Sequence, residues 1–278
     1  MCGISAIIDF CPTASLPLDL LQMHRQIPHR GPDGEGFLGL DRLQRVTTTH
    51  SAEAFRSYTA SGPWRLGLGF RWLKIQDLAA QAAQPMGTSD QAIWVLLNGE
   101  IYNFRELRAE LQQQGHRFHT ASDTEVVLAA YQTWGTACFQ RFSGMWAIVL
   151  VDCRQQKVVL SRDRFGIKPL FYSQDRRRLY LASEIKQILA VSALRPQVHQ
   201  KPVVNFLCGR RPQPSEETFF QDIYAVPAAT YAEISLTEPC PQALLFQPYW
   251  QLADFYCAAE AAAPPFPDAC ARFAQLLC

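Results

Sequence analysis

The sequence lacks any apolar run of the roughly 18 or more residues that a membrane-spanning helix requires. Its first residues have neither the basic n-region nor the apolar h-region of a secretory signal peptide. It also contains no Asn-x-Ser/Thr sequence for N-glycosylation. These absences predict a cytoplasmic protein that makes no contact with a membrane.

The cysteines include no Cys-x-x-Cys pair and no Cys/His cluster at zinc-ligand spacing, so we predict no metal site. Their odd number, nine, favours a reducing compartment over a disulfide framework. The formal net charge of +1 gives no footprint for nucleic acid, and 48% hydrophobic residues argue against disorder. Small neutral or zwitterionic substrates remain open.

Period-two alternation and short apolar runs predict strands separated by two central helices. The first strand, 3–10, carries Ile4, Ala6 and Ile8 on one face, and Pro12 is expected to end it. Capping-box patterns at Asn103 and Ser122 predict two helices. The further expected strands are 66–73, 93–97, 145–151, 157–161, 170–172 and 179–182, with a short helix in 16–27 and a solvated hairpin tip at 176–178. This order favours an α+β fold with antiparallel sheets.

The character of the chain changes after residue 193, because eleven of the 18 prolines follow it. Residues 258–267 are typical of a linker, and 268–278 begin a helix that has no C-terminal cap. We therefore predict a domain at 2–192, a connecting segment at 193–257 that completes its edge, and the linker and first helix of a further, truncated domain at 258–278.

Three chemical features suit acyl transfer from an amide. If Met1 is removed, Cys2 carries both a thiol nucleophile and a free α-amine, whose ordinary pKa of about 8 allows it to act as a base. Asn98 and Gly99 follow a buried strand and suit an oxyanion hole. Asp123 or Glu100 can pair with an ammonium group. Each feature also has a structural interpretation: a small strand residue, a turn, and an acid at a helix N-terminus.

Six segments, in order, resemble the glutaminase domain of glutamine-hydrolysing asparagine synthetases, which are class II glutamine amidotransferases with the N-terminal-nucleophile fold. The segments are Met-Cys-Gly-Ile at 1–4, His-Arg-Gly-Pro-Asp at 29–33, Asn-Gly-Glu-Ile-Tyr-Asn at 98–103, Ser-Asp-Thr-Glu at 122–125, Arg-Asp-Arg-Phe-Gly-Ile-Lys-Pro-Leu-Phe at 162–171 and Ala-Ser-Glu-Ile-Lys at 182–186.

The resemblance implies a four-layer αββα sandwich in which Cys2 hydrolyses glutamine to glutamate and ammonia. By position, Asn98 and Gly99 would form the oxyanion hole. Glutamine would be held by Leu73, Ile75, Asn98, Glu100 and Asp123. The domain itself would need no cofactor, whereas the family's synthetase domain uses ATP and Mg²⁺ to activate aspartate. The implied partners are glutamine and a synthetase domain, in cis or in trans, and a homodimer is possible.

One position departs from the family pattern. The family usually has Arg-Leu-Ser-Ile-x-Asp after the second long strand, and its arginine binds the α-carboxylate of glutamine. Alignment on Leu73, Ile75 and Asp77 places Trp72 at the arginine position, with Arg71 one residue early. A one-residue offset in a strand faces the opposite side. This leaves two alternatives open: a catalytically impaired domain with a structural or docking role, or the front half of another amidotransferase.

Overall fold

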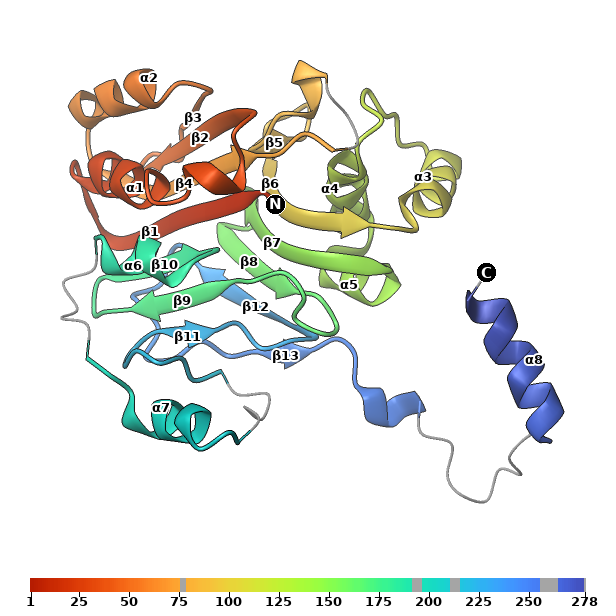
Figure 1. The fold of residues 1–278 in the computed structure, drawn as a ribbon. Helices are drawn as coiled ribbons and strands as arrows, with labels where there is room; N and C mark the ends of the chain where they lie inside the picture. The colour runs from red at the N-terminus through yellow and green to blue at the C-terminus, as the bar shows by residue number, and fades with distance from the viewer. Residues whose placement is uncertain (76–78, 192–196, 211–215, 256–264, 278) are drawn as a thin grey trace.

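The computed structural model describes residues 1–75, 79–191, 197–210, 216–255 and 265–277. Two β-sheets lie face to face, and helices cover the outer face of each (Figure 1). Every pairing between the named strands of the described chain is antiparallel. The predicted α+β fold, a four-layer αββα sandwich with antiparallel sheets, is confirmed.

The first sheet has the strand order β11-β9-β10-β1-β4-β2-β3, with β1 in the middle. Its strands are β1 (Gly3–Thr13), β2 (Gly34–Asp41), β3 (Val46–Thr49), β4 (Trp64–Trp72), β9 (Phe171–Gln174), β10 (Arg178–Ala182) and β11 (Tyr224–Ala225). The prediction that Pro12 ends the first strand is wrong. The pairing of β1 with β4 shifts register between Ile8 and Thr13, and a proline is tolerated at such an irregularity because its missing N–H breaks no regular ladder bond.

The second sheet has the strand order β13-β12-β8-β7-β6-β5. Its strands are β5 (Met86–Gly87), β6 (Ile93–Ile101), β7 (Gly144–Asp152), β8 (Lys157–Arg162), β12 (Thr230–Ser235) and β13 (Gln247–Pro248). The central strands are nearly continuous apolar runs because both of their faces are buried, one against the first sheet and one against helices.

Helices α1 (Leu16–His24), α2 (Ala52–Ser57) and α6 (Ile185–Leu189) cover the first sheet, while α3 (Phe104–Gln113), α4 (Asp123–Trp134) and α5 (Cys138–Arg141) cover the second (Figure 1). The described residues also form five short 3-10 helices: η1 (Pro28–Arg30), η2 (Tyr58–Ser61), η3 (Ala80–Ala82), η4 (Gly135–Ala137) and η5 (Leu252–Phe255). Among the described helices, none is long and apolar enough to cross a membrane.

The two predicted helix caps have different outcomes. The Ser122 side chain accepts a hydrogen bond from the Thr124 N–H at 3.1 Å and caps α4, as predicted. The helix predicted after Asn103 is present as α3 with Asn103 at its N-cap position, but the Asn103 side chain makes no cap bond, so the predicted capping box is wrong. Its Oδ1 instead accepts from the Ser143 N–H at 2.8 Å and ties the start of α3 to the start of β7. A distant backbone donor has displaced the local one.

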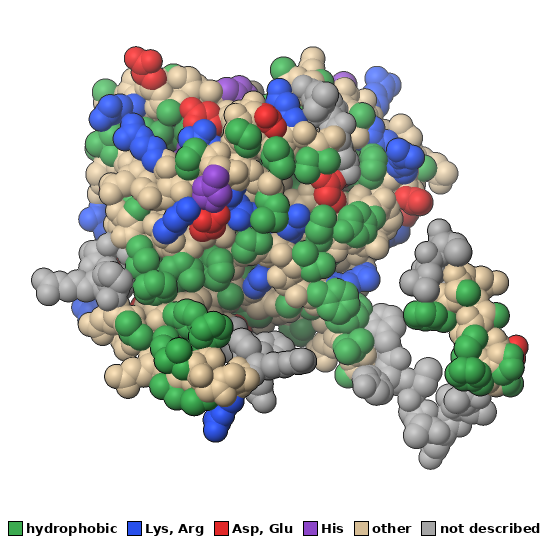
Figure 2. Space-filling model, viewed as in Figure 1, with side chains coloured by type: hydrophobic (Ala, Val, Ile, Leu, Met, Phe, Trp, Pro, Cys, Tyr) green, Lys and Arg blue, Asp and Glu red, His purple; other side chains and the backbone are tan. Residues whose placement is uncertain are grey.

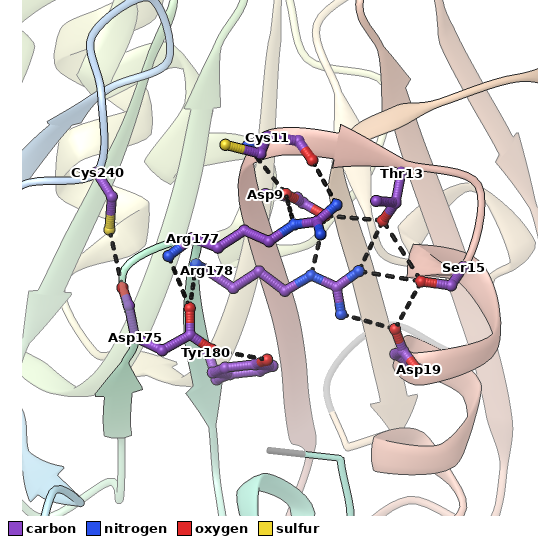
Figure 3. A network of polar contacts seen from close by, with 10 residues as sticks. All are labelled: Asp9, Cys11, Thr13, Ser15, Asp19, Asp175, Arg177, Arg178, Tyr180 and Cys240. Atoms are coloured by element: carbon purple, nitrogen blue, oxygen red, sulfur yellow. Dashed lines mark hydrogen bonds and ion pairs between the residues drawn. The ribbon is translucent and has the colours of Figure 1, made fainter. Parts of the chain in front are cut away.

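The hairpin at 176–178 is not wholly solvated, which corrects the prediction. Arg178 is buried, and its Nε donates to the fully buried Asp9 Oδ2 at 2.9 Å while Nη1 donates to Asp19 Oδ2 at 2.7 Å. Arg177 also reaches Asp9, with Nε 3.2 Å from Oδ1, but is about half exposed. Figure 3 shows these side chains linking β1, the start of α1 and the β9–β10 hairpin. The arginines therefore hold elements together.

The segment after residue 197 adds edge strands to both sheets, β11 to the first and β12 with β13 to the second. Before these strands in the chain comes α7 (Gln200–Leu207), none of whose residues is buried. Figure 2 shows hydrophobic side chains over α7, where Val204, Phe206 and Leu207 are exposed. Helix α8 (Phe266–Leu277) lies apart from the sheets (Figure 1). The predicted boundaries at 192/193 and 257/258 lie outside the described residues and stay predictions.

Candidate active site

Cys2 lies directly before the middle strand of the first sheet, and its thiol is held by the end of β4. The Leu73 N–H donates to Cys2 Sγ at 3.4 Å, and the thiol lies 3.6 Å from the Leu73 carbonyl oxygen, to which it donates. Because β1 pairs with both β4 and β10, the register of the sheet fixes the position of this side chain.

The backbone around Cys2 is held by two segments whose roles the sequence did not reveal. Arg30 Nε donates to the Cys2 carbonyl oxygen at 2.8 Å, and Arg30 Nη1 donates to Glu184 Oε1 at 3.2 Å. Ser183 Oγ accepts from the Ile4 N–H at 2.9 Å. The His-Arg-Gly-Pro-Asp and Ala-Ser-Glu-Ile-Lys motifs thus meet at the N-terminus, and their occurrence as motifs was the only sequence signal for it.

Glu184 connects these two motifs electrostatically. Burial opposes ionisation, but hydrogen bonds from Lys186, His29 and Arg30 outweigh it and lower the pKa of Glu184 to about 2. The carboxylate is therefore ionised near neutral pH and keeps Arg30 positioned on the Cys2 carbonyl.

A small cavity of about 40 Å³ opens beside the Cys2 thiol. It brings together seven of the predicted site residues: Cys2, Trp72, Leu73, Ile75, Gly99, Glu100 and Asp123. A volume of this size holds only about three water molecules. Asp77, used for the sequence alignment, lies outside the described residues.

Asn98 and Gly99 are placed at the same end of the sandwich. Asn98 is 1% exposed, and its Nδ2 has no hydrogen-bond partner among the described residues. Leu96 packs in the core between the sheets, so strand alternation points Asn98 towards the first sheet as well. At Gly99 a Cβ atom would lie 2.2 Å from the Met145 carbonyl oxygen, so only glycine fits. The oxyanion role of this pair stays a prediction.

Two carboxyl groups that line the cavity have raised pKa values. Burial, followed by the nearby Asp123 charge, raises the pKa of Glu100 to about 7. Burial also raises the pKa of Asp123, although its Oδ2 accepts from the Ile101 N–H at 2.9 Å. Two desolvated acids side by side provide a favourable environment for a cation, which would stabilise the charged form of both.

The Cys2 thiol is held mainly in its neutral form. Burial raises its pKa and the nearby Glu100 carboxyl adds to this effect, while the Leu73 N–H and the charges of the N-terminus and Lys168 lower the pKa. Lys168 is itself 9% exposed and acts on Glu100 as well. A thiol with a raised pKa needs a base to become a nucleophile.

Arg71 and Trp72 point to opposite sides of the first sheet. Arg71 Nη1 lies 3.1 Å from Glu35 Oε2, and the buried His24 Nε2 lies 3.4 Å from the same oxygen, under α1. Trp72 packs between the sheets and lines the cavity. This is the arrangement that strand alternation predicts, and it leaves Arg71 outside the cavity.

A second group of buried polar residues in the cavity wall was not predicted. The Gln84 amide accepts from the Leu97 N–H at 2.6 Å and donates to Thr124 Oγ1 at 3.2 Å. These bonds join the middle of β6 to the first turn of α4. Nothing in the sequence around a lone glutamine indicates a buried bridge of this kind.

Comparisons with known proteins agree with this geometry. Residues 40–250 match the model of the glutamine amidotransferase domain family. The chain is 34% identical over 261 residues to asparagine synthetase [glutamine-hydrolyzing] 2 of Bacillus subtilis, a match that covers 91% of this chain and 31% of the relative. It is 30% identical over 262 residues to amidase chry2 of Gibberella zeae, covering 91% of this chain and 34% of that protein.

Among solved structures, glutamine phosphoribosylpyrophosphate amidotransferase of B. subtilis superposes with a TM-score of 0.64. The match covers 89% of this chain and 49% of that one, at 15% identity, and so supports the fold alone. The chain spans about a third of the length of the curated relatives described above. It belongs to the glutamine amidotransferase domain family, as a class II domain of the type found in glutamine-hydrolysing asparagine synthetases.

Proposed function

We propose that this domain hydrolyses glutamine to glutamate and ammonia, with Cys2 as the nucleophile once Met1 has been removed. The observation that carries the proposal is the cavity in which the Cys2 thiol faces Gly99, Glu100 and Asp123. A nucleophile, a backbone N–H donor for the oxyanion and two acids are the groups that hydrolysis of an amino-acid amide requires.

The first step forms the thioester. The free α-amine of Cys2 takes the thiol proton as Sγ attacks the side-chain amide carbon of glutamine. The oxygen of the resulting tetrahedral intermediate is stabilised by the Asn98 Nδ2–H and the Gly99 N–H. The α-ammonium then donates its proton to the leaving nitrogen, the C–N bond breaks, and ammonia departs.

The second step releases glutamate. The α-amine, now neutral again, takes a proton from water as the water oxygen attacks the thioester carbon. The C–S bond breaks, and the thiolate recovers the proton. Glu100 and Asp123 hold the substrate ammonium throughout, so the amide stays aligned with the thiol.

We further propose that the ammonia serves a synthetase domain, in cis or in trans, which would bind ATP and Mg²⁺ and amidate aspartate. The support is the similarity to proteins described as asparagine synthetase [glutamine-hydrolyzing]. The glutaminase reaction itself needs no cofactor in this scheme. The cytoplasmic location and a homodimer stay predictions.

The test uses purified protein whose intact mass shows that Met1 is absent. We expect ammonia release from glutamine and labelling of Cys2 by a glutamine-like electrophile, both abolished by Cys2→Ala. The matched control is Cys11→Ala, which removes an exposed thiol from the far end of β1. Ammonia release that persists at the wild-type rate in Cys2→Ala would refute the proposal.

Trp72, at the position of the family's arginine, favours a second candidate, a catalytically weak domain that serves as a docking module for its synthetase partner. This function predicts that the partner domain is bound with equal affinity by the wild type and Cys2→Ala, and that glutamine turnover is negligible. Normal turnover of glutamine at saturable concentrations rules it out.

A further inference from the structure

The cavity beside Cys2 contains two acids, and no arginine or lysine belongs to its lining among the described residues. Glutamine carries a carboxylate as well as an ammonium group. If glutamine is the substrate, as proposed above, a cation must meet its α-carboxylate near the rim, since an unpaired carboxylate beside Glu100 and Asp123 would be repelled.

Three cations near the site are poorly placed for this role. Arg30 is already bound to the Cys2 carbonyl oxygen and to Glu184. Arg71 lies on the outer face of the first sheet, where its Nη1 contacts Glu35 Oε2 at 3.1 Å. Lys168 is buried, and its charge acts on the Cys2 thiol and on Glu100. It does not belong to the cavity lining, so it is not placed to meet the α-carboxylate at the rim.

Lys74 lies on the correct side of the chain. It comes two residues after Trp72, and its Nζ lies 4.7 Å from the centre of the Trp72 ring, which lines the cavity. The intervening Leu73 is hydrogen-bonded to the Cys2 thiol, and the Lys74 N–H donates to Asp33 Oδ2 at 2.9 Å. These hydrogen bonds to Cys2 and Asp33 thus fix the backbone of Lys74 relative to the Cys2 thiol.

The charge of Lys74 is available. None of the described carboxylates lies within ion-pair distance of its Nζ. The Trp72 ring holds the Lys74 ammonium on one side by a cation–π contact. The N–H donors on the other side of the ammonium are left to bind a carboxylate. We propose that Lys74, positioned on Trp72, binds the α-carboxylate of glutamine.

The experiment compares glutamine with glutaminamide, whose α-carboxylate is replaced by a neutral amide. We expect Lys74→Ala to raise KM for glutamine about tenfold, the factor that corresponds to one pKa unit of interaction free energy. The value of kcat should change less than twofold. KM for glutaminamide should not change. Lys74→Arg should recover most of the affinity. The control is Lys201→Ala, which removes a surface lysine of α7 that pairs with Glu217 at 3.3 Å.

A binding measurement separates this proposal from the proposed function. Glutamine and glutaminamide are titrated calorimetrically into Cys2→Ala and into Cys2→Ala combined with Lys74→Ala. The proposal is supported if the double variant binds glutamine more weakly than Cys2→Ala does while both variants bind glutaminamide equally. This outcome supports Lys74 even if the wild type releases no ammonia. Equal loss for both ligands, no loss for either, or no binding of glutamine to Cys2→Ala overturns the assignment.

Discussion

Glu100, in the wall of the cavity, changes its protonation state near neutral pH. Because burial and the Asp123 charge raise its pKa to about 7, Glu100 is mostly neutral at pH 6 and mostly ionised at pH 8. A substrate ammonium is attracted only by the ionised form. If Glu100 holds the substrate ammonium as proposed, glutamine binding depends on pH in a range where an ordinary glutamate is always charged.

We predict that glutamine binds up to about tenfold more weakly at pH 6 than at pH 8, in proportion to the ionised fraction of Glu100. Calorimetry with Cys2→Ala measures this without interference from the reaction. In Glu100→Gln the affinity should be low and nearly independent of pH. A wild-type affinity that is the same at both pH values would contradict the prediction.

Lys168 acts on the thiol rather than on the substrate. Its charge lowers the pKa of Cys2 against the effect of burial, so its removal should raise that pKa further. We predict that Lys168→Met slows alkylation of Cys2 at fixed pH by up to about tenfold, the effect of one pKa unit. Peptide mass spectrometry follows Cys2 separately from the other cysteines.

Lys157→Met is the matched control, because the Lys157 ammonium pairs with Glu233 at 2.6 Å on the second sheet. The rate of Cys2 alkylation should not change in this variant. An equal loss of rate in both variants would mean that altered packing, and not the Lys168 charge, is responsible.

The β9–β10 hairpin is attached to β1 by a buried ion pair, which makes it sensitive to a single substitution. Arg178→Ala leaves the Asp9 carboxylate fully buried without its main partner. We predict a loss of about 3–5 kcal/mol in the free energy of unfolding, the cost of stranding a buried charge. Urea denaturation measures it.

The neighbouring Arg177 provides the comparison within the same hairpin. Its guanidinium also contacts Asp9 but is about half exposed, so Arg177→Ala should cost only about 1 kcal/mol or less. If the two variants lose equal stability, burial is not the origin of the effect.

Elements were predictable from the sequence wherever local rules apply. The alternation of Ile4, Ala6 and Ile8 identifies β1, and the Ser122 cap identifies the start of α4. Partners distant in sequence were not predictable. Arg178 and Asp9 are 169 positions apart, so the sequence indicated a hairpin tip but not a buried ion pair. Asn103 failed as a cap for the same reason, because Ser143 competes for its side chain.

The meeting of the candidate residues at one cavity was predictable from the sequence, whereas the contacts that support them were not. Cys2, Gly99, Glu100 and Asp123 are residue types with recognisable roles, and they meet at one cavity. Arg30 reaches the site through the Cys2 carbonyl oxygen, an atom that every residue has. No pattern of residue types reveals such a contact, so this support became visible only in three dimensions.

At the scale of the whole molecule, stability should be concentrated in the middle of the two sheets. Strands β1 and β7 are each paired on both edges and covered on both faces. Helix α7 has no buried residue. We predict that hydrogen exchange of β1 and β7 amides requires global unfolding, whereas α7 amides exchange orders of magnitude faster. Exchange in α7 as slow as in β1 would show that its apolar face is covered in solution.

The position of Cys2 also governs how the protein can be produced for any of these measurements. Cys2, the proposed nucleophile, stands one residue before a strand that is paired on both edges, and it can carry a free α-amine only if nothing precedes it in the mature protein. In a protein with an N-terminal affinity tag, the nitrogen of Cys2 is part of a peptide bond and cannot act as a base. Preparations should carry a C-terminal tag, or a cleavable leader whose protease leaves cysteine as the first residue.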